Sequence, residues 1–168
     1  TGIDIHDEVL HIAKKYNELK NVKYLKANAD NLPFADNTFD IVCAMDLLEH
    51  VEDYQQAVSE GVRVLKKNGL FFFHTFNRNL FSKLFIIKGM EWFVKDTPKN
   101  LHVYHQFIKP KDLIQLFLQL NCVNKELKGL NLKIFSKSFL NLVFKSEIDK
   151  NLQFKIDSSL AAGYIGFC

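Results

Sequence analysis

The stretch FDIVCAMDLLEHVEDY, residues 39–54, constrains the fold of this chain more than any other part of the sequence. Residues 40–44 are mostly apolar and β-favouring, without the polar alternation of a half-exposed strand. Such a run is typical of a buried strand in a parallel sheet that is covered on both faces. Asp46, Glu49 and His50 follow at positions i, i+3 and i+4. On a helical turn, that spacing would put two carboxylates and one imidazole on the same side.

Strands and helices alternate along the chain, and this alternation predicts a doubly wound, mostly parallel α/β sheet. In open sheets of this kind, ligands bind beyond the carboxyl ends of the strands. The acidic trio occupies such a position, and the polar group HTFNRN follows the strand expected at residues 70–73. The two groups lie side by side if their strands are neighbours. The elements that we predict are strands at 1–5, 22–27, 40–44, 70–73 and 161–167 and helices at 7–18, 54–65 and 111–120, with a weaker strand at 122–127 and no firm assignment for 128–156.

Size and charge narrow the classes of protein. The chain has 168 residues, 48% of them hydrophobic, which suits one domain with a core of its own. A net charge of +3 is not the basic stripe of a nucleic-acid binder, so we expect no nucleic-acid partner. The three cysteines lack metal-type spacing and are odd in number, which favours a reducing cytoplasm. The sequence shows no signal peptide and no apolar run near the roughly 20 residues that span a bilayer.

Two further strand ends carry polar side chains. Asp4 closes the first expected strand, where it could bond both ribose hydroxyls of a nucleoside or could simply cap the helix that follows. Asn28 closes the second, where it could bind an adenine amino group or bond its own backbone in a turn. We interpret His74 and His105 as ordinary hydrogen-bonded or exposed histidines.

The segment 80–94 interrupts the alternation of strands and helices. It combines apolar and aromatic residues, among them Leu80, Met90 and Trp92, with lysines. It would form a helical lid over an apolar substrate, an element at a membrane surface, or a core helix. We assign residues 80–106 to such an insertion within a single domain of residues 1–168.

Several of these stretches together resemble class I S-adenosylmethionine-dependent methyltransferases. They are TGIDI, NADNLPFADNTFDIV, the EHV of LLEHV, and VLKKNGLFFFHT. Within that superfamily, AMDLLEHV, FNRN and PKNLHVYHQFIKP resemble the ubiquinone-biosynthesis O-methyltransferases that act on polyprenylated phenols. The resemblance implies a Rossmann-like methyltransferase fold with a helical insertion after the fourth visible strand.

The resemblance also implies a cofactor, S-adenosyl-L-methionine. Asp4, with Ile5 beside it, would hold the ribose of this cofactor. Asn28 and Ala29 would face the adenine, and Met45 would lie against the cofactor.

A metal and a base follow from the same resemblance. Asp46, Glu49 and His50 match the positions that bind Mg²⁺ in the family, although Asp46 replaces the usual glutamate and is one methylene shorter. In the absence of a metal, His50 or His102 would be the general base.

One departure from the family pattern is large. The first strand of the family and its glycine-rich loop should precede Thr1, and none of the seven glycines gives a G-x-G spacing. We therefore expect an N-terminally truncated fold that binds the cofactor weakly on its own, because that loop contacts the methionine part of the cofactor.

The resulting hypothesis is an O-methyltransferase that methylates a phenolic hydroxyl of a polyprenylated catechol or hydroquinone in ubiquinone biosynthesis. It would work in the cytoplasm at the inner membrane, in peripheral contact through residues 80–94, with other enzymes of the same biosynthesis as partners. A methyltransferase for another small molecule is one alternative. A non-catalytic remnant that binds a membrane or a partner chain is the other.

Overall fold

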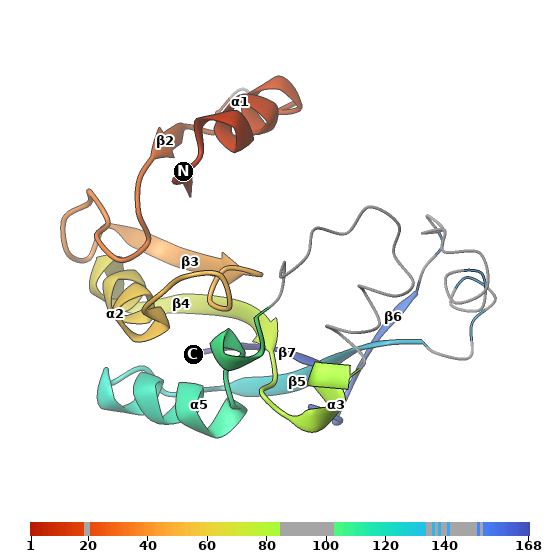
Figure 1. The fold of residues 1–168 in the computed structure, drawn as a ribbon. Coiled ribbons are helices and arrows are strands. Elements are labelled where there is room, and N and C mark those ends of the chain that lie inside the picture. The colour runs from red at the N-terminus through yellow and green to blue at the C-terminus, as the bar shows by residue number, and fades with distance from the viewer. Residues whose placement is uncertain are drawn as a thin grey trace.

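The structure is a computed structural model, and it describes residues 1–18, 21–84, 103–133, 136, 138, 141, 151 and 153–168. Strands and helices alternate over the first half, as the sequence predicts (Figure 1). The elements are β1 (Gly2–Asp4), α1 (Asp7–Lys15), β2 (Tyr24–Lys26), β3 (Phe39–Met45), α2 (Tyr54–Val64), β4 (Leu65–Phe76), α3 (Leu80–Ser82), the 3₁₀ turn η2 (Tyr104–Gln106), α5 (Pro110–Gln119), β5 (Glu126–Leu132), β6 (Phe154–Asp157) and β7 (Gly163–Phe167).

The described strands form two sheets. β1 and β2 pair in parallel as a two-stranded sheet, and the second sheet has the order β3-β4-β7-β5-β6. β3 and β4 pair in parallel, with Met45 opposite His74, whereas the pairings of β7 with β4 and β5, and of β5 with β6, are antiparallel. The α/β class is therefore as predicted, and the parallel β3–β4 pair makes neighbours of the two strands, which the sequence analysis left as a condition. The second half differs from the predicted parallel pattern, because β5, β6 and β7 run antiparallel to their neighbours.

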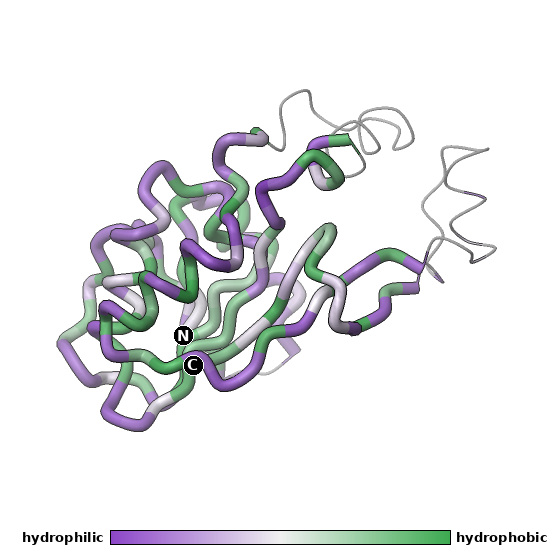
Figure 2. Tube along the Cα trace, turned by 90° about the horizontal axis from the view of Figure 1, so that it is seen from below, coloured by the Kyte–Doolittle hydropathy of each residue, from purple (hydrophilic) through white to green (hydrophobic). Residues whose placement is uncertain are grey.

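Helices α2 and α5 cover one face of the larger sheet (Figures 1 and 2). Alternate side chains of a strand point to opposite faces, and on β4 it is Phe71 and Phe73 that point toward the helices. The ring of Phe117, on α5, contacts both, at centroid distances of 5.1 and 5.2 Å. Tyr164 of β7 completes the cluster, and its hydroxyl donates to the backbone oxygen of Ile108 at 3.0 Å. This aromatic cluster is the core of the molecule.

The opposite face of the same sheet carries apolar side chains that remain open to solvent in the part of the chain that the structure describes. Ile41 and Met45 on β3 are 55% and 47% exposed, and Phe154 and Ile156 on β6 are 59% and 64% exposed. The apolar composition of β3 predicts burial on both faces, but only one face is packed here.

Helix α2 has a side-chain cap at its start, and a residue near its end bonds the loop before β3. We call the larger sheet and its helices the body of the molecule. The carboxylate of Asp53 caps it by accepting from the backbone N–H groups of Gln55 and Gln56, both at 3.0 Å. Near its end, Arg63 donates to the backbone oxygens of Leu32 and Phe34 at 3.0 and 2.8 Å. The same guanidinium pairs with two carboxylates, those of Glu60 and Asp36, each at 2.7 Å.

The N-terminal unit, β1-α1-β2, packs less tightly. Leu10 is the one residue that is buried in α1, whereas Val9, Ile12 and Tyr16 on the same helix are 47%, 55% and 72% exposed. In Figure 1 this unit lies beyond the β3 edge of the larger sheet.

Most of the expected insertion, residues 85–102, lies outside the described residues. Its first part is described: α3 begins after Asn79, whose side chain accepts from the backbone N–H of Ser82 at 2.9 Å. Leu80, Phe81 and Leu84 are exposed there. No helix in the described ranges has the length and apolar character that crossing a bilayer requires.

Candidate functional site

The carboxyl ends of β3 and β4 bring Asp46 and His74 together. The Asp46 carboxylate Oδ1 lies 2.7 Å from Nδ1 of His74, and its backbone N–H donates to the His74 backbone oxygen at 3.3 Å. The two side chains differ in environment, since that of His74 is 6% exposed and that of Asp46 is 61% exposed. Asp46 has a φ of 51°, a left-handed backbone conformation that aspartate tolerates better than most residues. The pair thus places an accessible carboxylate at the edge where ligands bind in such sheets.

The residue after His74 forms a second contact between the same two segments. The hydroxyl of Thr75 donates to Oε2 of Glu49 at 2.7 Å, and Glu49 is only 1% exposed. Burial raises the pKa of the Glu49 carboxyl above its ordinary value, with the Thr75 hydrogen bond acting in the opposite direction. Oε1 of Glu49 is buried without a hydrogen-bond partner. Thr75 and His74 are consecutive residues of a strand, so the two contacts lie on opposite faces of the sheet.

The predicted helical turn over the acidic trio is wrong, because residues 46–50 form a bend and a turn rather than an α-helix. Asp46 turns to His74, Glu49 turns inward to Thr75, and His50 remains exposed. Among the described residues, which include all three, no group of at least three His, Cys, Asp or Glu side chains could hold a metal ion. The donors therefore do not fit Mg²⁺ in this arrangement.

The residues predicted to bind a nucleoside lie at the ends of β1 and β2. Asp4 accepts from the backbone N–H of His6 at 2.8 Å, so it stabilises the turn into α1, and Ile5 beside it is 53% exposed. Asn28 accepts from the backbone N–H of Asp30 at 3.1 Å, which is the turn geometry that the sequence left open as an alternative. Ala29 is half-buried against the core cluster.

Asp30 is a residue that sequence reasoning missed. Its carboxylate Oδ1 is buried and has no hydrogen-bond partner, although the residue lies next to the predicted adenine-facing pair. An acceptor in that position suits the amino group of an adenine, and the acidic residue in the motif NADNLPF was the available signal.

The candidate cofactor residues are divided between the two sheets. Asp4 and Asn28 follow the strands of the small sheet, whereas Met45, 47% exposed, ends β3 of the large one. The pairings of the described strands join β1 to β2 and β3 to β4, but do not join β1 to β3. Asp4 and Met45 do not lie on one shared sheet of the described strands. Their proximity across a crevice therefore stays a prediction.

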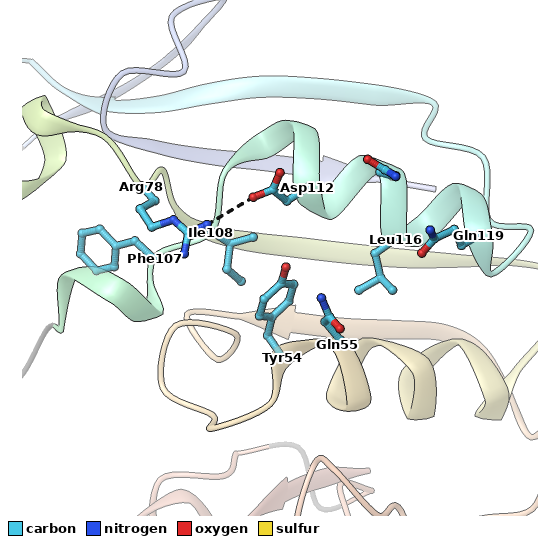
Figure 3. A pocket seen from close by; sticks show the side chains of 9 residues that line it. Tyr54, Gln55, Arg78, Phe107, Ile108, Asp112, Leu116 and Gln119 are labelled. Atoms are coloured by element: carbon cyan, nitrogen blue, oxygen red, sulfur yellow. Dashed lines mark hydrogen bonds and ion pairs between the residues drawn. The ribbon is translucent and has the colours of Figure 1, made fainter.

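A groove of about 480 Å³ lies between α2 and α5 (Figure 3). Arg78, two residues beyond β4, pairs with Asp112 at 3.3 Å across its mouth, and Tyr54 and Gln55 face it from α2. Its walls are mainly polar, with amide groups from α5. The groove is lined by Tyr54, Gln55, Arg78, Phe107, Ile108, Asp112, Gln115, Leu116 and Gln119.

The two candidate bases stay predictions. His50 ends the turn after β3, where its backbone N–H donates to the Leu47 oxygen at 2.9 Å. His102 lies outside the described residues. The histidine that contacts the acidic segment is instead His74, which we interpreted from the sequence as an ordinary histidine. The signal for it was the polar group that follows the β4 hydrophobic run, and the parallel β3–β4 register confirms that this group lies beside the acidic segment.

Known proteins match both the sequence and the fold. A family model described as "Methyltransferase domain" matches residues 1–73. Ubiquinone biosynthesis O-methyltransferases are similar to this chain. The one from Pelagibacter ubique is 35% identical over 141 residues, which are 82% of this chain and 58% of the relative. The one from Thiobacillus denitrificans is 32% identical over 157 residues, 92% of this chain and 66% of the relative.

Solved structures agree on the fold. An S-adenosylmethionine-dependent methyltransferase from Thermotoga maritima superposes with a TM-score of 0.65 at 21% identity, covering 99% of this chain and 70% of that one. Another from Aquifex aeolicus gives a TM-score of 0.57 at 12% identity, with 98% and 65% covered.

The family match and the shared fold together define the class: residues 1–73 match a methyltransferase domain, and the chain has the fold of S-adenosylmethionine-dependent methyltransferases. Within the class, the chain is similar to the ubiquinone biosynthesis O-methyltransferases, and the match to one of them covers 92% of its length. The chain spans between half and two-thirds of the length of those curated relatives, from 50% to 66%.

Proposed function

We propose that the protein transfers a methyl group from S-adenosyl-L-methionine to a phenolic hydroxyl of a polyprenylated catechol or hydroquinone in ubiquinone biosynthesis. The observation that carries the proposal is the polar rim at the ends of β3 and β4, in a chain that is 32–36% identical to ubiquinone biosynthesis O-methyltransferases. The proposal concerns the whole protein, and the chain spans 50% to 66% of the length of these relatives.

The residues at the ends of the small sheet would hold the nucleoside. The carboxylate of Asp4 would accept from the ribose hydroxyls, and the adenine amino group would meet Asn28 and the buried oxygen of Asp30. Met45 would pack on the cofactor from the neighbouring sheet. When bound, the cofactor supplies an electrophilic methyl group on a sulfonium.

The phenol must approach that methyl group in line, so positioning supplies much of the rate. A phenolic hydroxyl has a pKa near 10 by analogy with tyrosine, so an acceptor for its proton assists the attack. The exposed carboxylate of Asp46 is such an acceptor. The Asp46 carboxylate would take the phenolic proton and pass it to water, while the methyl group would move to the phenolic oxygen and the cofactor would leave as the thioether.

Mg²⁺ is not needed for that assignment, and the donor geometry does not favour it. Asp46 and Glu49 are each engaged with a side chain of β4, and these two contacts lie on opposite faces of the sheet. We therefore expect methyl transfer by the whole protein to persist when a chelator removes divalent ions. Loss of activity in chelator, restored by Mg²⁺, would show that the trio reassembles around a metal.

The segment 80–94 would contact a membrane surface, where it would meet the apolar tail of the substrate. In its described part, Leu80 is 79% exposed, Leu84 is 50% exposed, and Lys83 lies between them. Apolar and basic side chains together suit an anionic interface. The protein would then work at the cytoplasmic face of the inner membrane. Co-sedimentation with anionic liposomes that falls with added salt supports this, and equal binding to neutral liposomes contradicts the electrostatic part.

The direct test is a radiolabel assay with the whole protein. S-adenosyl-L-methionine carrying a labelled methyl group is incubated with a catechol bearing a short prenyl chain, and the organic phase is counted and analysed by mass. Asp4→Asn should weaken cofactor binding at least tenfold, on the scale of a lost charge-assisted hydrogen bond. Asp7→Asn is the matched control, since its pair with Lys26 is exposed and worth little.

Two results would point elsewhere. Transfer to other small phenols but not to the prenylated catechol would indicate a methyltransferase with a different substrate. Binding of liposomes without any methyl transfer, by a correctly folded whole protein, would indicate a non-catalytic module.

A further inference from the structure

We propose that His74 is a positioning residue that holds the carboxylate of Asp46 toward the methyl acceptor, and that Gly163 provides the space for its imidazole ring. The inference rests on the proposed function, because the acceptor is the phenol named there. It goes further by assigning a role to a buried histidine on the face of the sheet opposite the core cluster.

His74 contacts Asp46 in two ways. The ring nitrogen Nδ1 lies 2.7 Å from the carboxylate, and the backbone oxygen accepts the Asp46 N–H at 3.3 Å. Together these contacts hold a residue with a φ of 51°, a left-handed conformation that few residues other than glycine, asparagine and aspartate adopt. Asp46 lies in the bend between the end of β3 and the following turn, so these two contacts join the bend to β4.

The ring itself is held between neighbouring strands. His74 is 5% exposed, and it pairs in register with Ile165 of β7 and with Met45 of β3. A Cβ atom on Gly163 would lie 2.8 Å from Nε2, so any larger residue there would push the ring toward Asp46 or away from it. The next atom that this Cβ would crowd is the backbone oxygen of Leu130, at 3.3 Å, so the imidazole sets the tighter of the two limits on a side chain at this position.

The tautomer follows from the partners. A carboxylate accepts, so Nδ1 carries the hydrogen, and Nε2, which is buried without a hydrogen-bond partner, is left bare in the neutral ring. The ring then acts as a fixed donor to Oδ1 of Asp46. With that oxygen occupied, the carboxylate has a fixed orientation while it stays 61% exposed at the strand ends. A fixed acceptor is what an in-line displacement needs, since a small misplacement of a reacting group costs much of the rate.

The experiment compares variants of the whole protein in the methyl-transfer assay with the prenylated catechol. His74→Phe keeps the ring volume but removes the donor, and His74→Asn keeps a donor near the position of Nδ1. We expect His74→Phe to lower kcat by about tenfold to a hundredfold, as a misplaced reacting group does, with the KM for S-adenosyl-L-methionine unchanged. His74→Asn should recover most of kcat. A purely packing role would make Asn the more damaging change, and that order would overturn the proposal.

Gly163→Ala tests the same contact without touching either partner. It should lower kcat in the wild-type background and have little further effect beside His74→Asn, because the shorter side chain has no atom at the Nε2 position. Equal effects in both backgrounds would contradict the assigned role of Gly163.

A spectroscopic measurement separates this inference from the proposed function. In protein labelled with ¹⁵N-histidine, His74 should show a protonated Nδ1 and a bare Nε2, and Asp46→Asn should change the Nδ1 signal. The opposite tautomer would contradict the proposed role of His74 in holding Asp46, whether or not the protein is active. If the wild type shows the expected tautomer but transfers no methyl group to the catechol, the proposed function fails while the contact stands.

Discussion

The body of the molecule and its N-terminal unit use similar residues to different effect. In the body, Phe71, Phe73 and Phe117 pack into a cluster in which each is at most 1% exposed. In the N-terminal unit, Ile5, Ile12 and Tyr16 are all more than half exposed. The body has helices packed across its sheet, whereas α1 is the helix that packs on β1 and β2 among the described residues. Apolar composition therefore yields stability only where a second layer covers it.

This contrast separates two tasks of the proposed enzyme. The acceptor side, at β3 and β4, lies on the tightly packed body. The nucleoside side, at β1 and β2, lies on the loosely packed unit. We therefore expect that structure added around β1 changes cofactor binding more than it changes the positioning of the acceptor.

The largest expected effect tests the core. Phe73→Ala removes a fully buried ring that contacts Phe117 and Tyr164, so it should lower the free energy of unfolding by about 3–5 kcal/mol. Urea denaturation checks this value. Phe154→Ala is the matched control, because that ring is 59% exposed on β6 and its loss should cost well under about 1 kcal/mol. Equal losses would show that the second face of the sheet is packed as well.

The next effect tests the joint between the two regions. Arg63→Lys replaces a guanidinium that bonds two backbone oxygens and two carboxylates by a single ammonium, which cannot reach all of them. We expect a loss of about 1–3 kcal/mol in the free energy of unfolding. Hydrogen exchange should also speed up in the 32–36 loop. Unchanged exchange there would mean that the loop is held by other contacts.

A smaller effect, with a definite pH dependence, tests Glu49. Burial raises the pKa of its carboxyl above the ordinary 4.5, so the charged form is disfavoured in the folded state. Its contribution favours folding at acidic pH and is lost as the pH rises from the unfolded pKa to the folded one. Glu49→Gln should remove this dependence and raise the stability at pH 8, on the order of 1 kcal/mol. Thermal melts at pH 4 and pH 8 decide it. A stabilisation that is larger at pH 4 would reverse the sign and contradict the argument.

The smallest effect tests the N-terminal unit. Ile12→Ser replaces an apolar side chain that is 55% exposed, so the change in the free energy of unfolding should stay within about 0.5 kcal/mol. A loss near 2 kcal/mol in the same urea experiment would show that this helix face is covered in solution.

Much of the fold followed from the sequence because its signals are local. The hydrophobic run at 40–44 predicted β3, and the helices expected at 54–65 and 111–120 match α2 and α5 within a few residues. The helical turn over the acidic trio failed for a tertiary reason: Asp46 adopts a left-handed backbone and turns to His74, and Glu49 is drawn inward by Thr75. Neither partner lies close to the trio in sequence.

The sequence by itself determined the class of the protein, since the polar residues at strand ends and the order of the motifs are local patterns that can be read from the sequence alone. Only the tertiary structure decided which side chains act together. The pairing of β3 with β4 placed His74 against Asp46, and β7 contributed the glycine that leaves room for the ring. Such contacts join residues far apart in the chain, and the packing of whole strands, not the local sequence, sets their distances.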